Sequence, residues 1–256
     1  MIKAAFFDID GTLLSHKTRQ VSPNTIAAIR TLREKGIPCI VATGRHKTEM
    51  DKLPLEGLDF DGYLTLNGQL VLDRNMQFLA GVPIEGEAKE ILLDIFENHT
   101  LPMLILEQER VYLNYYAPVV QRVQDAISTP VPAFGHYYGA PIYQTCLYLP
   151  EGDHPCLELL RQHCEVTWWN SGGVDVIAKG GGKVAGIQRY LEATGIRREE
   201  IIAFGDGEND LEMLRFAGIG VAMGNAEDAV KAAADYVTDT VDEDGVAKAL
   251  KHFGLI

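Results

Sequence analysis

Cysteine is scarce in this sequence and is never arranged at a metal-binding spacing. The four cysteines are Cys39, Cys146, Cys156 and Cys164. Because no C-x-x-C pair occurs and none lies at zinc-finger spacing from a histidine, we expect reduced thiols rather than disulfides or zinc ligands.

Long apolar runs are also lacking. No stretch reaches the roughly 18 apolar residues that a membrane-spanning helix needs. Asp8 interrupts the N-terminal apolar run too early for a signal peptide. We therefore expect a cytoplasmic protein with no membrane partner.

Positive charge is in deficit. The chain has 23 lysines and arginines against 36 aspartates and glutamates, which gives a formal net charge of -13. This balance argues against nucleic acid or an anionic membrane surface as the main partner. The 46% hydrophobic content is that of a globular protein, and 256 residues suffice for two domains of ordinary size. We expect a monomer or a weak homodimer.

The two ends of the chain carry an α/β pattern. Strand 2–7, a helix that starts at Ser22-Pro23 and ends at Gly36, and strand 37–42 form a βαβ unit, whose strands must be parallel. A hairpin of short strands is expected between 64 and 79. The later elements are expected as follows: helix 183–194, strand 201–204, helix 211–217, strand 219–222, helix 226–234, strand 236–237 and helix 245–253. Together they predict a Rossmann-like, doubly wound parallel sheet formed by residues 1–81 and 182–256.

Residues 82–181 have a different character and predict an inserted α+β domain. The expected elements are helix 88–96, strands 103–106 and 111–115, helix 119–127, strand 142–149, helix 154–163, and strands 165–169 and 174–177. The insert holds five lysines and arginines against thirteen acidic residues, a formal charge of −8. An acidic insert disfavours polyanions and suits a small substrate with a single phosphate.

Two acidic clusters lie far apart in the sequence, each at the end of an apolar run. Asp8–Thr12 (DIDGT) follows residues 4–7, and Gly205–Asp210 (GDGEND) follows residues 201–204. If the two strands are neighbours in a parallel sheet, three or four carboxylates converge. Two unit charges about 4 Å apart repel by about 4 kcal/mol at an effective dielectric of 20. A hard divalent cation relieves that repulsion, and Mg²⁺ is the natural choice for oxygen ligands.

Two further features could bind a phosphate. Thr43 and Gly44 end strand 37–42 and offer a hydroxyl and a flexible backbone amide. Lys183 follows three glycines and begins a helix, where a cation can neutralise a phosphate oxygen. Taken singly, Thr43-Gly44 is also compatible with an ordinary strand exit, and Lys183 with a solvated lysine.

Together these segments resemble the four motifs of the haloacid dehalogenase-like superfamily, specifically its Cof-type phosphatases. The matching segments are Asp8–Leu14, Ala42–Arg45 (ATGR), Lys183 and Gly205–Asp210. Supporting matches are Asn67-Gly68, Ala222–Ala226 (AMGNA) and Asp244–Val246 (DGV). The resemblance covers the whole chain, and it makes residues 82–181 a cap domain that closes over the site and sets specificity.

The resemblance implies a catalytic role for the first motif. Asp8 is expected to be the nucleophile that forms an aspartyl-phosphate, and Asp10 the acid–base residue. Mg²⁺ is expected on the Asp8 side chain, the Asp10 backbone carbonyl and Asp206. Asp210 is expected to support the metal indirectly.

The remaining site residues are expected to hold the substrate. The resemblance gives the transferring phosphoryl group to Thr43, Gly44, Lys183 and Asn209. Arg45 is expected either to reach the substrate or to brace Asp210. Asn67, Asp175 and Asn170 are weaker candidates for substrate contact. One or both of Trp168-Trp169 are expected to pack in the cap sheet rather than stack on a substrate. His16, His46 and His136 are expected to be surface or loop residues, because they lack ligand spacing.

The family points to phosphate release from small metabolites, above all sugar phosphates, with pyridoxal phosphate or flavin mononucleotide as other substrates. Phosphomutases of the phosphomannomutase type are similar in core and cap, but they must hold a second phosphate. Only three arginines, scattered through the insert, argue against that alternative. A catalytically inactive phosphate-binding regulator is a rival from another class, and it predicts the loss of at least one motif residue. Dehalogenase chemistry does not need a second aspartate such as Asp10, so its presence argues against a dehalogenase.

Overall fold

The chain folds as two compact units. The computed structural model describes residues 1–50, 52–127, 129–152 and 154–256. One unit, which we call the core, joins Met1–Ala80 to Lys183–Ile256; the other, the cap, is Gly81–Gly182. The expected insert was 82–181. Among the described residues, no helix is both long enough and apolar enough to cross a membrane.

The core contains a mostly parallel sheet. Within the described residues its strand order is β13-β12-β11-β1-β2-β3-β4-β5. Neighbouring strands run parallel from β13 to β3, and β4 pairs antiparallel with β3. The strands are β1 (Ala4–Phe7), β2 (Cys39–Ala42), β3 (Gly62–Thr65), β4 (Leu70–Asp73), β5 (Phe78–Gly81, which crosses into the cap by one residue), β11 (Ile201–Gly205), β12 (Ile219–Ala222) and β13 (Tyr236–Val237).

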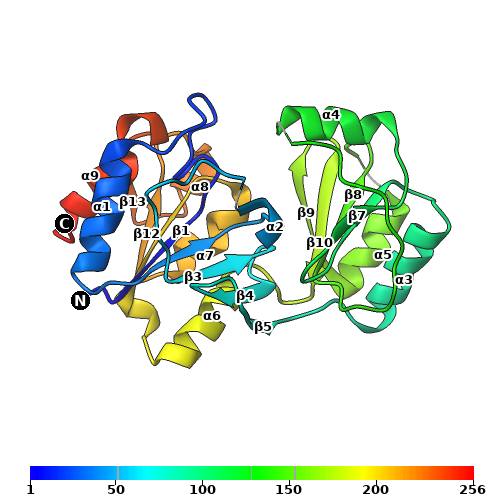
Figure 1. The fold of residues 1–256 in the computed structure, drawn as a ribbon, viewed down its shortest axis with the longest axis horizontal. Helices are drawn as coiled ribbons and strands as arrows, with labels where there is room; N and C mark the ends of the chain where they lie inside the picture. The colour runs from blue at the N-terminus through cyan, green and yellow to red at the C-terminus, as the bar shows by residue number, and fades with distance from the viewer. Residues whose placement is uncertain (51, 128, 153) are drawn as a thin grey trace. The chain divides into compact units, whose positions relative to one another are not determined.

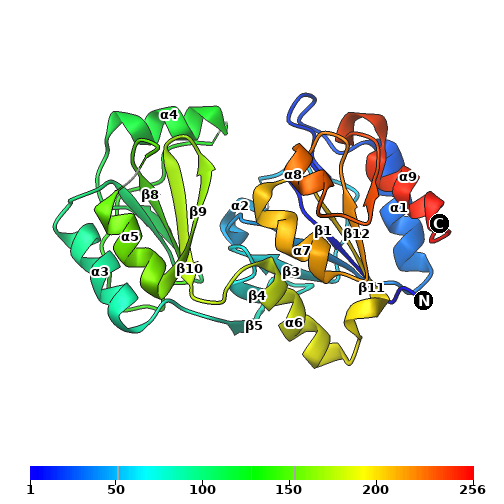
Figure 2. The same ribbon diagram turned by 180° about the vertical axis from the view of Figure 1, so that it is seen from behind.

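Helices cover both faces of this sheet, so the predicted α/β fold class is confirmed (Figures 1 and 2). The helices of the core are α1 (Pro23–Glu34), α2 (Lys47–Met50), α6 (Lys183–Thr194), α7 (Leu211–Phe216), α8 (Asp228–Lys231) and α9 (Gly245–His252). Short 3-10 turns occur at Arg198–Glu200, Glu208–Asp210 and Val241–Glu243.

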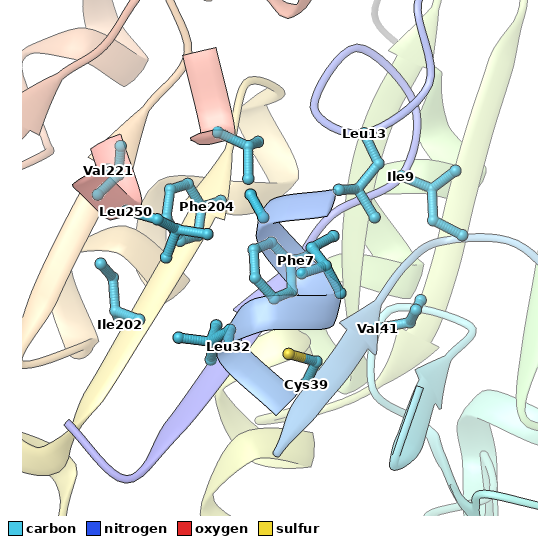
Figure 3. Close-up of a cluster of buried hydrophobic side chains, with 14 of the residues drawn as sticks. Phe7, Ile9, Leu13, Leu32, Cys39, Val41, Ile202, Phe204, Val221 and Leu250 are labelled. Carbon is cyan, nitrogen blue, oxygen red and sulfur yellow. The ribbon is translucent and has the colours of Figure 1, made fainter. Parts of the chain in front are cut away.

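Alternation along the buried strands gives the core two hydrophobic clusters. Phe7 and Phe204 point to one face, where their rings stack 5.0 Å apart among residues of α1 and α9 such as Leu32 and Leu250 (Figure 3). Phe6 points to the other face, among residues of α6, α7 and α8. A strand that is buried on both sides must be apolar throughout, as the runs 4–7 and 201–204 are.

Strand β1 lies between β11 and β2. Phe7 is in register with Phe204 on one side and with Val41 on the other. Because all three strands run in the same direction, the segments that begin at Asp8, Thr43 and Asp206 leave the sheet at the same edge. The two acidic clusters are therefore neighbours, although almost the whole chain separates them.

The cap is an α+β unit with an antiparallel sheet of order β7-β6-β8-β10-β9. Its hydrophobic cluster brings α3 and α5 onto the sheet, through residues such as Leu92, Leu157 and Val176. The cap elements are α3 (Gly86–Glu97), β6 (Met103–Leu106), β7 (Val111–Leu113), α4 (Pro118–Ala126), β8 (Gln144–Tyr148), α5 (Pro155–His163), β9 (Cys164–Asn170) and β10 (Gly173–Ala178).

One predicted element was wrong, and two local features were not anticipated. The helix expected at 226–234 is only α8, because Asp235 exchanges hydrogen bonds with Gly220 and draws the chain into β13. The short helix α2 was not expected. His46 lies in a loop, as expected, but it is buried, and its Nδ1 accepts a hydrogen bond from the Thr48 amide at the start of α2.

Candidate active site

Asp8 lies at the end of β1 and its side chain is buried. Its backbone amide donates to the carbonyl of Phe204 at 3.0 Å, which continues the parallel ladder into the loop. Its carboxylate accepts a hydrogen bond from Lys183 Nζ at 2.6 Å, and the two side chains are 9% and 1% exposed. Asp8 is therefore held rigidly at the edge where the strands end.

Lys183 bridges two carboxylates. Its Nζ also lies 2.6 Å from Oδ1 of Asp210, which is fully buried. The other oxygen of Asp210 accepts the backbone amides of Asp206 and Gly207 at 3.0 and 2.9 Å. Asp210 thus shapes the loop that carries Asp206, and Lys183 reaches the site from the first turn of α6.

Three carboxylates converge on one small volume. Asp8, Asp206 and Asp210 each offer an oxygen, and these oxygens lie within 4.8 Å of one another. Burial raises the pKa of Asp206 to about 6. The hydrogen bond from Thr12 acts to lower this pKa, and the nearby Asp210 carboxylate acts to raise it. Burial also raises the pKa of Asp8, since the attraction of Lys183 does not offset it and the other carboxylates oppose ionisation.

The net charge of this cluster is negative and favours binding of a cation. Burial alone would lower the pKa of Lys183, but Asp210 and Asp8 outweigh it and raise the pKa, so the amine stays charged. One ammonium against three carboxylates leaves an excess of negative charge. Buried oxygen donors with excess negative charge are the donor set that a hard divalent cation such as Mg²⁺ requires, so the residues fit a metal.

Gly11 lets the first acidic loop approach the second. Its φ is +86°, and a Cβ built there would lie 2.1 Å from Oδ2 of Asp206. Next to it, the hydroxyl of Thr12 donates to Oδ1 of Asp206 at 2.8 Å. Glycine is needed here for both its backbone conformation and its missing side chain.

Asp10 forms a two-point ion pair with Arg45. Nε and Nη2 of Arg45 donate to the two carboxylate oxygens at 2.6 and 2.7 Å. Hydrogen bonding to Asp10 raises the pKa of Arg45 despite partial burial, which alone would lower it. Arg45 therefore braces Asp10 and not Asp210, which Lys183 and the loop amides hold instead.

The expected phosphate-binding residues lie together on neighbouring loops. A Cβ on Gly44 would be 3.2 Å from Oδ1 of Asn67, and that oxygen accepts a hydrogen bond from Asn209 at 3.0 Å. The hydroxyl of Thr43 is buried and accepts the amide of Arg45 at 3.1 Å. Asn67 has a φ of +53°, and its amide donates to the Thr43 carbonyl, which holds the turn against the second motif.

Asp175 belongs to the cap, on β10, where it is in register with Cys146 and Thr167. Two contributors to the site were not singled out from the sequence, namely Thr12 and Asn225. Both lie inside quoted motif segments, but their contacts with Asp206 depend on how the loops fold together.

Comparison with known proteins agrees with this geometry. A family model of haloacid dehalogenase-like hydrolases matches residues 5–250. The chain therefore belongs to the haloacid dehalogenase-like hydrolases, and the resemblance found in its motifs is confirmed.

Individual relatives match over nearly the full length. The 5-amino-6-(5-phospho-D-ribitylamino)uracil phosphatase YcsE of Bacillus subtilis is 32% identical, over 99% of this chain and 96% of its own. The structure of the haloacid dehalogenase superfamily phosphatase BT1666 from Bacteroides thetaiotaomicron has a TM-score of 0.91 at 33% identity, covering 100% and 96% of the two chains. The subclass IIB sugar phosphatase BT4131 has a TM-score of 0.83 at 35% identity, covering 99% and 100%.

Proposed function

We propose that the protein is a Mg²⁺-dependent cytoplasmic phosphatase, a monomer or weak homodimer, that hydrolyses small phosphorylated metabolites through an aspartyl-phosphate on Asp8. The observation that carries the proposal is the convergence of Asp8, Asp206 and Asp210 beside Lys183. Phosphatases among the full-length relatives support the reaction class.

The reaction needs a nucleophile and a proton donor from the same loop. A carboxylate oxygen of Asp8 attacks phosphorus, the bond from phosphorus to the leaving oxygen breaks, and Asp10 gives its proton to that oxygen. Asp10 then takes a proton from a water molecule as that water attacks the phosphorus of the acyl phosphate. Phosphate leaves, and both aspartates return to their starting states.

Arg45 must adjust during this cycle. It donates to both oxygens of Asp10, whereas a protonated carboxyl carries a hydrogen on one of them. We expect Arg45 to release at least one hydrogen bond when Asp10 holds its proton.

Charge neutralisation falls to the cation and to this chain's own donors. Asp8, Asp206 and the Asp10 carbonyl would hold Mg²⁺, with Asp210 supporting the loop, and the bound ion would supply positive charge that offsets phosphate–carboxylate repulsion. Thr43, the Gly44 amide, Lys183 and Asn209 would hold the phosphoryl oxygens.

Sugar phosphates are the substrates we favour. The BT4131 relative is a sugar phosphatase, and YcsE acts on a phosphorylated ribityl compound. The cap sequence carries a formal charge of −8, which suits one phosphate better than two. In the cap, Arg161 pairs with Glu158, and Arg110 lies over the ring of Tyr112 near Glu107. Two of the three cap arginines are therefore already engaged within the cap, which disfavours binding of the second phosphate that a phosphomutase must hold.

The test is phosphate release from a panel of sugar phosphates, pyridoxal phosphate and flavin mononucleotide, with Mg²⁺ and with EDTA. We expect release that requires Mg²⁺ and is absent in Asp8→Asn. Conversion of mannose 6-phosphate to its 1-phosphate isomer without release would establish a mutase instead. Stoichiometric ligand binding without release across the panel would establish a regulator.

A further inference from the structure

Asn225 joins three loops that are distant in the sequence. Its Nδ2 donates to the Gly11 carbonyl at 2.9 Å and to Oδ2 of Asp206 at 3.1 Å. Its Oδ1 accepts the backbone amide of Val241 at 2.9 Å. One side chain therefore contacts the nucleophile loop, the second acidic loop and the C-terminal loop.

The orientation of this amide is unambiguous. The Val241 amide is a donor, so the atom facing it must be Oδ1. The Gly11 carbonyl and the Asp206 carboxylate are acceptors, so the atom facing them must be Nδ2. The alternative orientation would lose all three hydrogen bonds.

The C-terminal loop packs against the backbone next to Asn225 and fixes its position. The amide of Gly224 donates to the Asp239 carbonyl at 3.0 Å, and a Cβ on Gly224 would lie 2.8 Å from the backbone there. The hydroxyl of Ser15 donates a hydrogen bond to Oδ1 of Asp242 at 2.6 Å, so the same loop also contacts the residue that follows the first motif.

Asp206 is consequently held from two sides. Thr12 donates to Oδ1 and Asn225 donates to Oδ2, and the two donors come from different loops. Two donors on separate oxygens fix the plane of the carboxylate. Since each carboxylate oxygen can accept about two partners, capacity remains on both oxygens for a cation.

We propose that Asn225 is a positioning residue for the metal site, which orients the Asp206 carboxylate toward a divalent cation and is itself oriented by the Val241 amide. This inference rests on the proposed Mg²⁺ site, and it gives a physical role to the AMGNA segment near the C-terminus. Donors of this kind behind a metal ligand typically change metal affinity or activity by about 10–100-fold.

The test measures Mg²⁺ binding to the full-length protein by titration calorimetry, without substrate. Asn225→Ala should raise the Kd for Mg²⁺ about 10-fold, the lower end of that range, because Asn225 is solvent-exposed. Asn98→Ala is the matched control, since Asn98 is an exposed asparagine that donates to an aspartate in the cap, and it should leave the Kd unchanged.

A second variant leaves Asn225 in place. Val241→Pro removes the amide hydrogen that orients the side chain, and it also replaces a partly buried valine that packs against the core cluster. Proline is tolerated at this first position of the 3-10 turn. Val241→Pro should also raise the Kd for Mg²⁺, but by less than Asn225→Ala does. Phosphate release by both variants should recover at saturating Mg²⁺ with an unchanged substrate KM, which a general loss of folding would not produce.

The outcomes separate the two proposals. Wild-type affinity in both variants overturns the role of Asn225 and leaves the phosphatase proposal standing. If the wild-type protein itself binds no Mg²⁺, the magnesium site is wrong, and the role of Asn225 is overturned with it.

Discussion

The core and the cap both bury polar side chains, but they do so in different ways. In the cap, some buried polar groups hydrogen-bond to one another locally, such as Tyr112 with Glu107 and Gln124 with Tyr148, each at 2.6 Å. In the core, Asp8, Asp206 and Asp210 converge, and Asp8 and Asp210 share a single lysine. Paired burial stabilises a fold, whereas excess like charge opposes folding and is typical of functional sites.

Sheet topology explains the difference. Parallel strands end at one edge of the sheet, so loops from residues 8, 43 and 206 converge in the core. Antiparallel strands alternate in direction, so the loops of the cap sheet are divided between its two ends. A cluster of carboxylates from distant segments forms more readily in the first arrangement.

The largest expected effect separates the two units directly. Asp8→Asn should lower the rate of phosphate release by about 10⁴-fold or more, because the amide is not a nucleophile. The matched cap variant Asp175→Asn should keep kcat within about 10-fold and change KM at most. Comparable losses of kcat in the two variants would contradict the assignment of the chemistry to the core.

Asp10→Asn should have the next largest effect. Loss of the acid–base group should lower kcat by about 10²–10⁴-fold, with less loss for substrates whose leaving groups need no proton. Stopped-flow measurement of phosphate release from a sugar phosphate and from p-nitrophenyl phosphate compares the two. Normal activity of the variant toward both would refute the role of Asp10.

Gly186→Ala tests the packing that delivers Lys183. A Cβ at this position in α6 would lie 2.8 Å from the Gly68 backbone, next to Asn67. In an open helix this change stabilises by about 0.5–1 kcal/mol, but here we expect a loss of about 1–3 kcal/mol from overpacking. Denaturant unfolding gives the sign, and an increase in stability would show that α6 can move away without cost.

The pH dependence of stability tests the charge excess in the core. The pKa of Asp206 is raised from 3.8 to about 6, chiefly by burial, so the folded state holds this proton more tightly than the unfolded chain does. Wild-type stability should therefore fall as the pH rises from about 4 to about 6.

Asp206→Asn removes this titration. In EDTA, the unfolding free energy of the variant relative to the wild type should rise by about 1–2 kcal/mol between pH 4.5 and 7.5, after allowance for partial exposure. A difference that does not change with pH would contradict the raised pKa.

The smallest effect is expected in the cap. Tyr112→Phe removes the donor to buried Glu107 and should cost about 1–2 kcal/mol of stability. Because this pair belongs to the cap core, kcat for phosphate release should be unchanged. A change in kcat without a loss of stability would show that paired polar groups in the cap also serve the chemistry.

Much of the architecture could be read from the sequence. The apolar runs at 4–7 and 201–204 predict strands buried on both faces, and acidic residues at their ends predict convergence if the strands are adjacent. The helix expected at 226–234 failed because a side chain, Asp235, binds the neighbouring strand. Such long-range hydrogen bonds leave no periodic signal in the sequence.

The detailed contacts of the site were beyond the reach of the sequence. Sequence reasoning left Arg45 between the substrate and Asp210, whereas the structure pairs it with Asp10. It did not predict that the amine of Lys183 lies between Asp8 and Asp210, where the structure places it. Which of several nearby charges a flexible side chain binds depends on loop placement to within about an ångström.

The sequence by itself determined which residues can carry the chemistry, because residue type and position at a strand end follow directly from the order of the chain. Tertiary structure decided which of these groups touch. Hydrogen bonds that join residues 11, 206, 225 and 241 require that segments from both ends of the chain lie side by side.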